Sequence, residues 1–253
     1  MTAPAQPEDF VCFKFRAINK HLIESLVNPS LYFAKPNTLN DPFDCRLDLR
    51  SAFTRVASLA TGDRKRWLSQ FLDNPTFFDN WKYQLDNFGV CSFSLTMDET
   101  LLWSHYADEH RGVCLVYRFP ESFILDPKLR LTAGGEVKYI SEPLTEWLKN
   151  TPMSMEQNVL KELIHICLKT KSPGWRYEKE ARLIRREPGI FNISGKFITE
   201  ICFGLGTPQD DIDLVIKLGR DYCGCTTFTQ MVRDDSDFGF TRRGFPVPRP
   251  VVS

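Results

Sequence analysis

Two glutamates stand two positions apart in the stretch GWRYEKEARLI, which covers residues 174–184. Residues two apart on a β-strand lie on the same face, so this spacing predicts two neighbouring carboxylates, Glu178 and Glu180. One interpretation is a solvated strand face with cross-strand ion pairs that use Arg176 and Arg182. The other is a paired-carboxylate site. One carboxylate would stabilise a positively charged, sugar-like transition state, and the other would orient a nucleophile or take its proton.

Two further strand-like segments carry polar residues where a buried strand would have apolar ones. FKFR, residues 13–16, ends in Arg16, whose guanidinium suits bidentate binding of an anion such as a phosphate. CSFS, residues 91–94, places Ser92 and Ser94 on one face, where small hydroxyls leave room for a ligand and can bond to it. For each segment the alternative is a polar strand face in contact with water.

A predicted helix in LLWSHYADEHRG brings aromatic residues and a histidine together. Trp103, His105 and Tyr106 can line a ligand pocket by stacking and by directed hydrogen bonds. The alternative is a core histidine whose hydrogen bonds are satisfied. His105 and His110 are five apart, so they do not share a helix face, and the spacing favours no catalytic metal.

Composition and charge exclude several classes of protein. The 253 residues carry a formal net charge of 0, which does not favour a nucleic-acid or membrane surface binder. The first ten residues lack a signal-peptide pattern, and no apolar run is long enough for a membrane span. Cysteines within apolar runs, such as Cys12 and Cys114, are typical of buried, reduced thiols, so we expect a cytoplasmic protein. The close pair Cys223 and Cys225 has no second ligand pair that would indicate a zinc site.

Alternation of strand-like and helix-like segments predicts one α+β domain with a mixed, mostly antiparallel β core. We place this domain at residues 10–233, with helical insertions near 51–86 and 142–171. Residues 1–9 are expected to form a flexible lead, and residues 234–253 an extended, proline-rich tail.

Several motifs together resemble a bacterial family called domain of unknown function 2971. They are LYFAKPNTLNDPFDC, GVCSFSLTMDETLLWSHYADEHRGVCLVY, WRYEKEARLI and ITEICFG, in this order between about residues 10 and 233. The resemblance implies a shared fold, and it implies a bacterial setting such as that of a toxin, an effector or a phage-defence protein. The name of the family records no activity.

A second resemblance implies a mechanism. ADP-ribosyltransferases of the Arg–Ser–Glu type carry an arginine that ends an early strand, then S-x-S, then E-x-E, and Arg16, CSFS and YEKE follow that order. This resemblance implies a two-sheet core and a pocket in which NAD is the substrate. Arg16 would hold the pyrophosphate. Glu180 would bond to a ribose hydroxyl and stabilise the oxocarbenium ion, while Glu178 would face the acceptor.

In the same reading, Ser92 and Ser94 would shape the nicotinamide-ribose site, and Trp103, His105 or Tyr106 would form a wall. The acceptor stays open among protein, nucleic acid, a small molecule and water, which would make the protein a transferase or a glycohydrolase. Phe93 is expected to face the core.

Two other functions remain open from the sequence. The protein could be a non-catalytic sensor that binds a nucleotide or a partner in a bacterial stress or phage-defence system. It could also be a metal-dependent phosphodiesterase that uses Asp41, Asp44, His105 and Glu180, although these residues lack a recognisable ligand spacing.

Overall fold

The computed structural model describes residues 9–234 and 239–245. An eight-stranded sheet forms its centre, in the order β12-β11-β10-β4-β1-β3-β8-β5. The β10–β11 pair is parallel, and the other pairs of this sheet are antiparallel. The strands are β1 (Phe10–Arg16), β3 (Phe88–Ser94), β4 (Val113–Phe119), β5 (Leu131–Glu136), β8 (Glu180–Arg186), β10 (Ile198–Phe203), β11 (Thr227–Arg233) and β12 (Phe240–Gly244). The α+β class with a mixed, mostly antiparallel sheet is therefore confirmed.

The sheet is almost divided at its middle. β1 pairs with β4 at seven consecutive positions, from Phe10 to Arg16, but its register with β3 contains the single pair Phe13 and Ser94. The core is therefore one continuous sheet instead of the two sheets that were expected, and a single residue pair connects β1 with β3. This connection is called the weak link below. Strands that part in this way leave side chains and backbone groups free to line a cavity.

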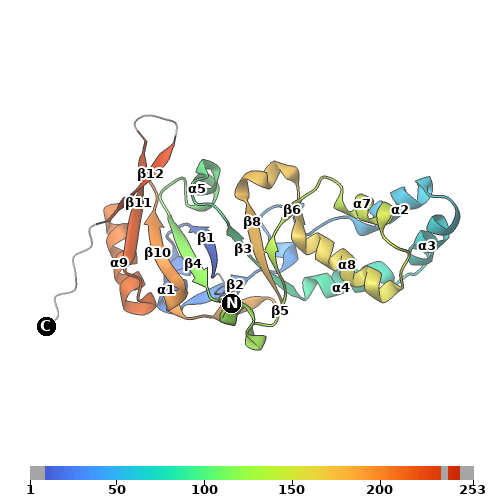
Figure 1. Cartoon of the computed structure of the whole chain (residues 1–253), viewed down its shortest axis with the longest axis horizontal. Coiled ribbons are helices and arrows are strands. Elements are labelled where there is room, and N and C mark those ends of the chain that lie inside the picture. The colour runs from blue at the N-terminus through green and yellow to red at the C-terminus, as the bar shows by residue number, and fades with distance from the viewer. Residues whose placement is uncertain (1–8, 235–238, 246–253) are drawn as a thin grey trace, which may run out of the picture.

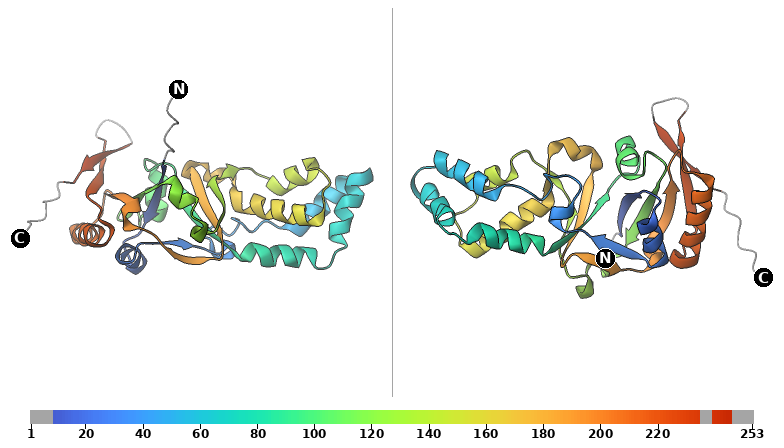
Figure 2. Two further views of the ribbon diagram at one scale, coloured as in Figure 1. Left: turned by 60° about the horizontal axis from the view of Figure 1, so that its bottom comes forward. Right: turned by 180° about the vertical axis from the view of Figure 1, so that it is seen from behind.

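Helices cover both faces of the half of the sheet that contains β4 and β10. On one face α1 (Lys20–Val27) packs beside α9 (Gln209–Cys223), and both contribute apolar side chains such as Leu26 and Val215 to one core cluster (Figure 2). On the other face α5 (Thr100–Tyr106) places Trp103 against Phe15 and Cys202. Short helical segments complete the connections: η1 (Pro36–Thr38), α6 (Glu121–Ile124), η2 (Pro127–Leu129), η3 (Pro173–Glu178) and η4 (Gly195–Phe197).

Five helices form a lobe at the other end of the molecule, beyond β8 and β5 (Figure 1). They are α2 (Leu49–Leu59), α3 (Gly62–Leu72), α4 (Phe77–Asp86), α7 (Pro143–Asn150) and α8 (Glu156–Lys169). The lobe thus joins two segments that lie far apart in the sequence around one apolar core, in which Phe53 contacts Phe71, Phe77 and Phe78. Two small sheets complete the fold. β6 (Lys138–Tyr139) pairs with β7 (Thr170–Lys171), which directly follows α8, and β2 (Ser30–Phe33) pairs with β9 (Gly189–Asn192) and packs on the core cluster below α1 and α9.

The chain beyond residue 233 differs from the expected tail. β12 continues the sheet antiparallel to β11, and Arg242 of β12 forms an ion pair with Glu200 at 3.1 Å. The prediction of a tail over 234–253 is therefore wrong for residues 240–244, because edge pairing to β11 outweighs the turn signals of this segment. Residues 246–253, and residues 1–8 of the expected lead, lie outside the described residues.

All eight cysteines are buried and free, which confirms the prediction made for those in apolar runs, such as Cys12 and Cys114. Burial raises the pKa of the Cys223 thiol to about 11, and it also raises the pKa of Cys225, so both thiols of the CGC stretch are protonated at neutral pH. Of the helices in the described part of the chain, none has the length and apolar character that a membrane span requires.

Candidate functional site

A cavity of about 160 Å³ lies where β1 and β3 separate. Residues from β1, β3, α5, the loop before α2, β7 and the start of β8 all face it. The lining residues are Phe13, Lys14, Phe15, Asn40, Ser92, Phe93, Ser94, Leu102, Tyr106, Lys171, Glu178 and Glu180. The weak link in the sheet therefore becomes a site to which segments more than 160 positions apart contribute.

The two glutamates reach this cavity by a route that differs from the prediction. Glu178 is the last residue of η3, Lys179 adopts a left-handed backbone with φ of 43°, and Glu180 is the first residue of β8. They are thus not alternate residues of one strand. Both carboxylates nevertheless line the cavity, because the left-handed residue between them turns the chain into β8.

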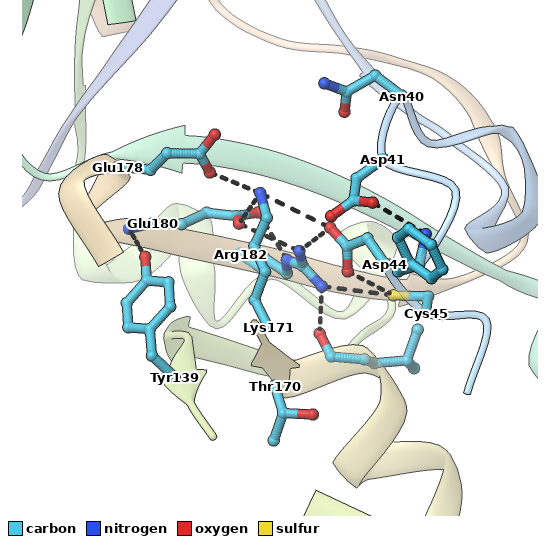
Figure 3. Close-up of polar contacts among 12 residues, drawn as sticks. Asn40, Asp41, Asp44, Cys45, Tyr139, Thr170, Lys171, Glu178, Glu180 and Arg182 are labelled. Carbon is cyan, nitrogen blue, oxygen red and sulfur yellow. Dashed lines mark hydrogen bonds and ion pairs between the residues drawn. The ribbon is translucent and has the colours of Figure 1, made fainter. Parts of the chain in front are cut away.

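Two buried cations hold these carboxylates. The Lys171 ammonium lies 2.6 Å from Glu178 Oε2 and 3.1 Å from Glu180 Oε2 (Figure 3). The Arg182 guanidinium donates from Nε to Glu180 Oε1 at 2.6 Å and from Nη2 to Glu180 Oε2 at 3.1 Å. A third carboxylate, Asp44, accepts from Arg182 Nη2 at 2.5 Å and lies 3.8 Å from the Lys171 ammonium. Three carboxylates and two cations therefore form one buried network.

The network sets the charge state of its members. Burial alone would raise the pKa of Glu180, but Arg182 and then Lys171 outweigh burial, and they lower that pKa to about 2. Burial alone would lower the pKa of Lys171, but Glu180 and Glu178 raise it above its ordinary value. Glu180 is therefore an anion and Lys171 a cation throughout the physiological pH range.

Tyr106 completes the wall around Glu178. Its hydroxyl donates to Glu178 Oε1 at 2.7 Å and accepts from Asn40 Nδ2 at 3.2 Å. Burial, followed by the hydrogen bond to Glu178, raises the pKa of Tyr106, so the phenol remains a neutral donor. On the other side of the pair, Tyr139 Oη accepts from the backbone N–H of Glu180 at 2.8 Å.

The S-x-S strand contributes both hydroxyls to the lining. Ser94 Oγ donates to the carbonyl of Glu178 at 2.7 Å and accepts from the N–H of Thr96 at 3.0 Å, so Ser94 fixes the turn that carries Glu178. Ser92 also lines the cavity, and its carbonyl accepts from the Lys14 ammonium at 2.7 Å. Phe93 lies in the core cluster beneath α1 and α9, as expected.

Three residues of the predicted site do not line the cavity. Arg16 lies at the end of β1, where its carbonyl packs closely against Gly112, and Lys14 provides the cation of the cavity instead. Trp103 is fully buried in the core beside Phe15, and its indole N–H donates to the Met97 carbonyl at 2.8 Å. The placement of Arg16 follows from the separation of β1 from β3, whose register contains only the pair Phe13 and Ser94, and that of Trp103 follows from its packing in the core.

The third predicted residue that does not line the cavity is His105. Its ring faces the rings of Tyr106 and Tyr177, with centroid separations of 6.3 and 6.4 Å. Of the aromatic residues predicted for the wall, Tyr106 is thus the one that lines the cavity.

The carboxylates do not form the metal-binding group that the phosphodiesterase alternative requires. Glu180 and Asp44 both receive bonds from Arg182, and a fixed guanidinium between two carboxylates repels a metal cation. In residues 9–234 and 239–245 no three His, Cys, Asp or Glu side chains are grouped as metal ligands. The phosphodiesterase hypothesis therefore lacks its metal site in this part of the chain.

Sequence reasoning missed Lys171 altogether and gave Arg182 only a surface role. Lys171 is the last residue of CLKTK, residues 167–171, which follows the longest amphipathic pattern of the chain. A lysine at such a position is typical of a helix end in contact with water, so its burial was not expected. A signal was available, since two glutamates seven and nine positions later need a cation if they face inward.

Residues 102–183 match the model of a family described as "Protein of unknown function (DUF2971)". This segment contains Tyr106, Lys171, Glu178 and Glu180, and ends just beyond Arg182. The resemblance to this family is therefore confirmed over residues 102–183. Comparisons with curated proteins and with solved structures gave no match. The resemblance to ADP-ribosyltransferases stays a prediction.

Proposed function

We propose that the cavity binds the nicotinamide-ribose end of NAD and that the protein cleaves the bond between nicotinamide and ribose. The observation that supports this most strongly is the convergence of two short motifs. Ser92 and Ser94 of one strand line the same cavity as Glu178 and Glu180, more than 80 positions later. A serine hydroxyl beside paired carboxylates, as Ser92 provides, suits the hydroxyl groups of a ribose, while Ser94 holds the turn that carries Glu178.

The chemistry follows from the charge that develops on the sugar. The bond between ribose C1′ and the pyridinium nitrogen breaks, its electron pair leaves with neutral nicotinamide, and an oxocarbenium ion forms. The Glu180 carboxylate stabilises that positive charge. An acceptor then forms a bond to C1′ and loses a proton, which Glu178 takes when it faces the acceptor. With water as the acceptor, the products are nicotinamide, ADP-ribose and a proton.

Lys14 supplies the cation for the phosphate in this proposal, in place of Arg16. Its ammonium bonds to the Ser92 carbonyl at 2.7 Å and lies 5.0 Å from the centre of the Phe93 ring. An ammonium has three donors, so further donors can face a phosphate. The cavity of about 160 Å³ is smaller than pockets that enclose a whole ligand, which are roughly 300–1,000 Å³, so the adenosine end would extend outside it.

The eight buried, free cysteines support a cytoplasmic setting for this activity, since such thiols persist under reducing conditions.

Release of nicotinamide from NAD tests the proposal. We expect release by the wild type, alone or with cell lysate as a source of acceptors, and a loss of about 100-fold or more in Glu180→Gln. Glu200→Gln is a matched control, because Glu200 is also a strand glutamate paired with an arginine but lies outside the cavity lining. Absence of release by the wild type under both conditions would refute the proposal.

One observation favours a second candidate, a module that binds a nucleotide without turning it over. Glu180 is already compensated by Arg182 and Lys171, and a compensated carboxylate stabilises a developing cation less than a free one does. Calorimetry with ADP-ribose separates the two candidates. Binding by the wild type that persists in Glu180→Gln, without any nicotinamide release from NAD, would support the non-catalytic module.

A further inference from the structure

Lys171 occupies a buried position at the root of the helical lobe. It follows α8 and pairs with Tyr139 in the short parallel sheet of β6 and β7. Its side chain is 5% exposed, and it lines the cavity. The Trp175 ring lies 4.9 Å from its ammonium and covers it on one side.

The ammonium of Lys171 is the group that the two glutamates share. Figure 3 shows the carboxylates of Glu178 and Glu180 converging on its nitrogen from two different elements, η3 and β8. Arg182 contacts Glu180 and Asp44, and its bonds to carboxylates are with these two. Without Lys171, three buried carboxylates would therefore face the single cation of Arg182, and Glu178 would keep, among the described residues, the hydroxyl of Tyr106 as its partner.

We propose that Lys171 is a positioning residue, whose ammonium holds the Glu178 and Glu180 carboxylates side by side and facing the cavity. Both carboxylates lie within 3.1 Å of the one ammonium, and removal of this shared cation leaves two neighbouring buried anions whose repulsion favours uptake of a proton by one of them. The role as a positioning residue for NAD cleavage rests on the proposed function. The effect on the two carboxylates does not, so it can be measured separately.

A purely structural role is the alternative. In that case the Lys171 side chain would fill space at the base of the lobe, and the ionisation of the two glutamates would not depend on its ammonium. The charged and titratable groups that face the ammonium from the surrounding elements are Asp44, Tyr106, Tyr139, Tyr177, Glu178, Glu180 and, through the shared carboxylates, Arg182.

The experiment is a titration of carbon-13-labelled glutamate side chains by NMR, in the wild type, Lys171→Met and Lys171→Arg. Resonances are assigned with Glu178→Gln and Glu180→Gln. In Lys171→Met we expect one of the two carboxyl groups to titrate one to three pH units higher than in the wild type. Lys171→Arg should restore the wild-type titration. Lys169→Met is the matched control, since Lys169 lies two positions away and bonds to a backbone carbonyl instead of a carboxylate.

Equal titration in Lys171→Met and the wild type would overturn the proposal. If Lys171→Met is unfolded at neutral pH, the double variant Lys171→Met/Glu178→Gln decides. Recovery of folding in the double variant supports the proposal, and failure to fold shows that the side chain is needed for packing alone. If the wild type releases no nicotinamide but Lys171→Met shows the shifted titration, the proposed function fails while the assignment of Lys171 stands.

Discussion

Removal of the Arg182 side chain should destabilise the protein far more than removal of a surface arginine. Arg182 is 1% exposed, and its guanidinium donates to Glu180, to Asp44 and to the Leu168 carbonyl. In Arg182→Met, two buried carboxylates lose this partner, and breaking a buried pair in this way costs about 3–5 kcal/mol. The pKa of Glu180 gives an independent figure. A drop from 4.5 to about 2 corresponds to about 3 kcal/mol, to which Lys171 also contributes.

The assay is equilibrium unfolding in urea at pH 7, followed by circular dichroism and tryptophan fluorescence so that two-state behaviour is checked. Arg118→Met is the matched control, because Arg118 is 54% exposed and pairs with Asp9 at 3.6 Å. Exposed pairs of this kind contribute less than about 1 kcal/mol. A loss below about 1 kcal/mol in Arg182→Met would refute the network as a determinant of stability.

Three further predictions concern Glu180, Tyr106 and the close contact between Gly112 and β1. Because the pKa of Glu180 is lowered by folding, its stabilisation is complete above pH 4.5 and is lost as the pH falls towards 2. We expect a loss of about 2 kcal/mol, reduced in Glu180→Gln, when urea unfolding is compared at pH 5 and pH 2.5, since the loss is complete only below pH 2. Tyr106→Phe removes the hydroxyl that donates to Glu178, and we expect a loss of about 2 kcal/mol in the same assay at pH 7; an unchanged midpoint would contradict this bond. Gly112→Ala would place a Cβ 2.2 Å from the Arg16 carbonyl oxygen of β1 and should cost at least about 2 kcal/mol. Gly244→Ala, whose Cβ would meet no atom of the described residues within 4 Å, should shift stability by less than about 0.5 kcal/mol.

The pair of glutamates shows what spacing in a sequence can and cannot predict. Their shared direction was predicted from strand alternation, and both carboxylates do face one cavity. The backbone that achieves this is different, because Lys179 is left-handed and the strand begins only at Glu180. A left-handed lysine has no local signal, since its conformation is fixed by contacts such as the bond from the Leu95 N–H to its carbonyl.

The cations of the site were harder to predict than the carboxylates. Lys14 and Arg16 lie two positions apart, so they share one face of β1. The position at which β1 separates from β3 determines that Lys14, and not Arg16, lines the cavity. Lys171 follows α8, and the apolar pattern of this helix predicts only which residues pack into the core of the lobe. Both outcomes depend on tertiary contacts between distant segments, which local patterns do not contain.

The strand β12 is a third case. Turn-forming residues and prolines after residue 233 predicted an extended tail, yet Phe240–Gly244 pairs with β11 along its whole length. The exposed edge of a sheet presents unpaired backbone N–H and C=O groups, and an extended segment pairs with them even when its strand propensity is modest.

A crystal structure of the protein with ADP-ribose tests the central claim most directly, because ADP-ribose is the product of the proposed cleavage. We predict that its terminal ribose occupies the cavity between β1 and β3, with hydroxyls within hydrogen-bond distance of Glu180 and a phosphate beside Lys14. A cavity that stays empty at saturating ADP-ribose, or ADP-ribose bound with its ribose away from Glu180, would contradict the assignment of this site.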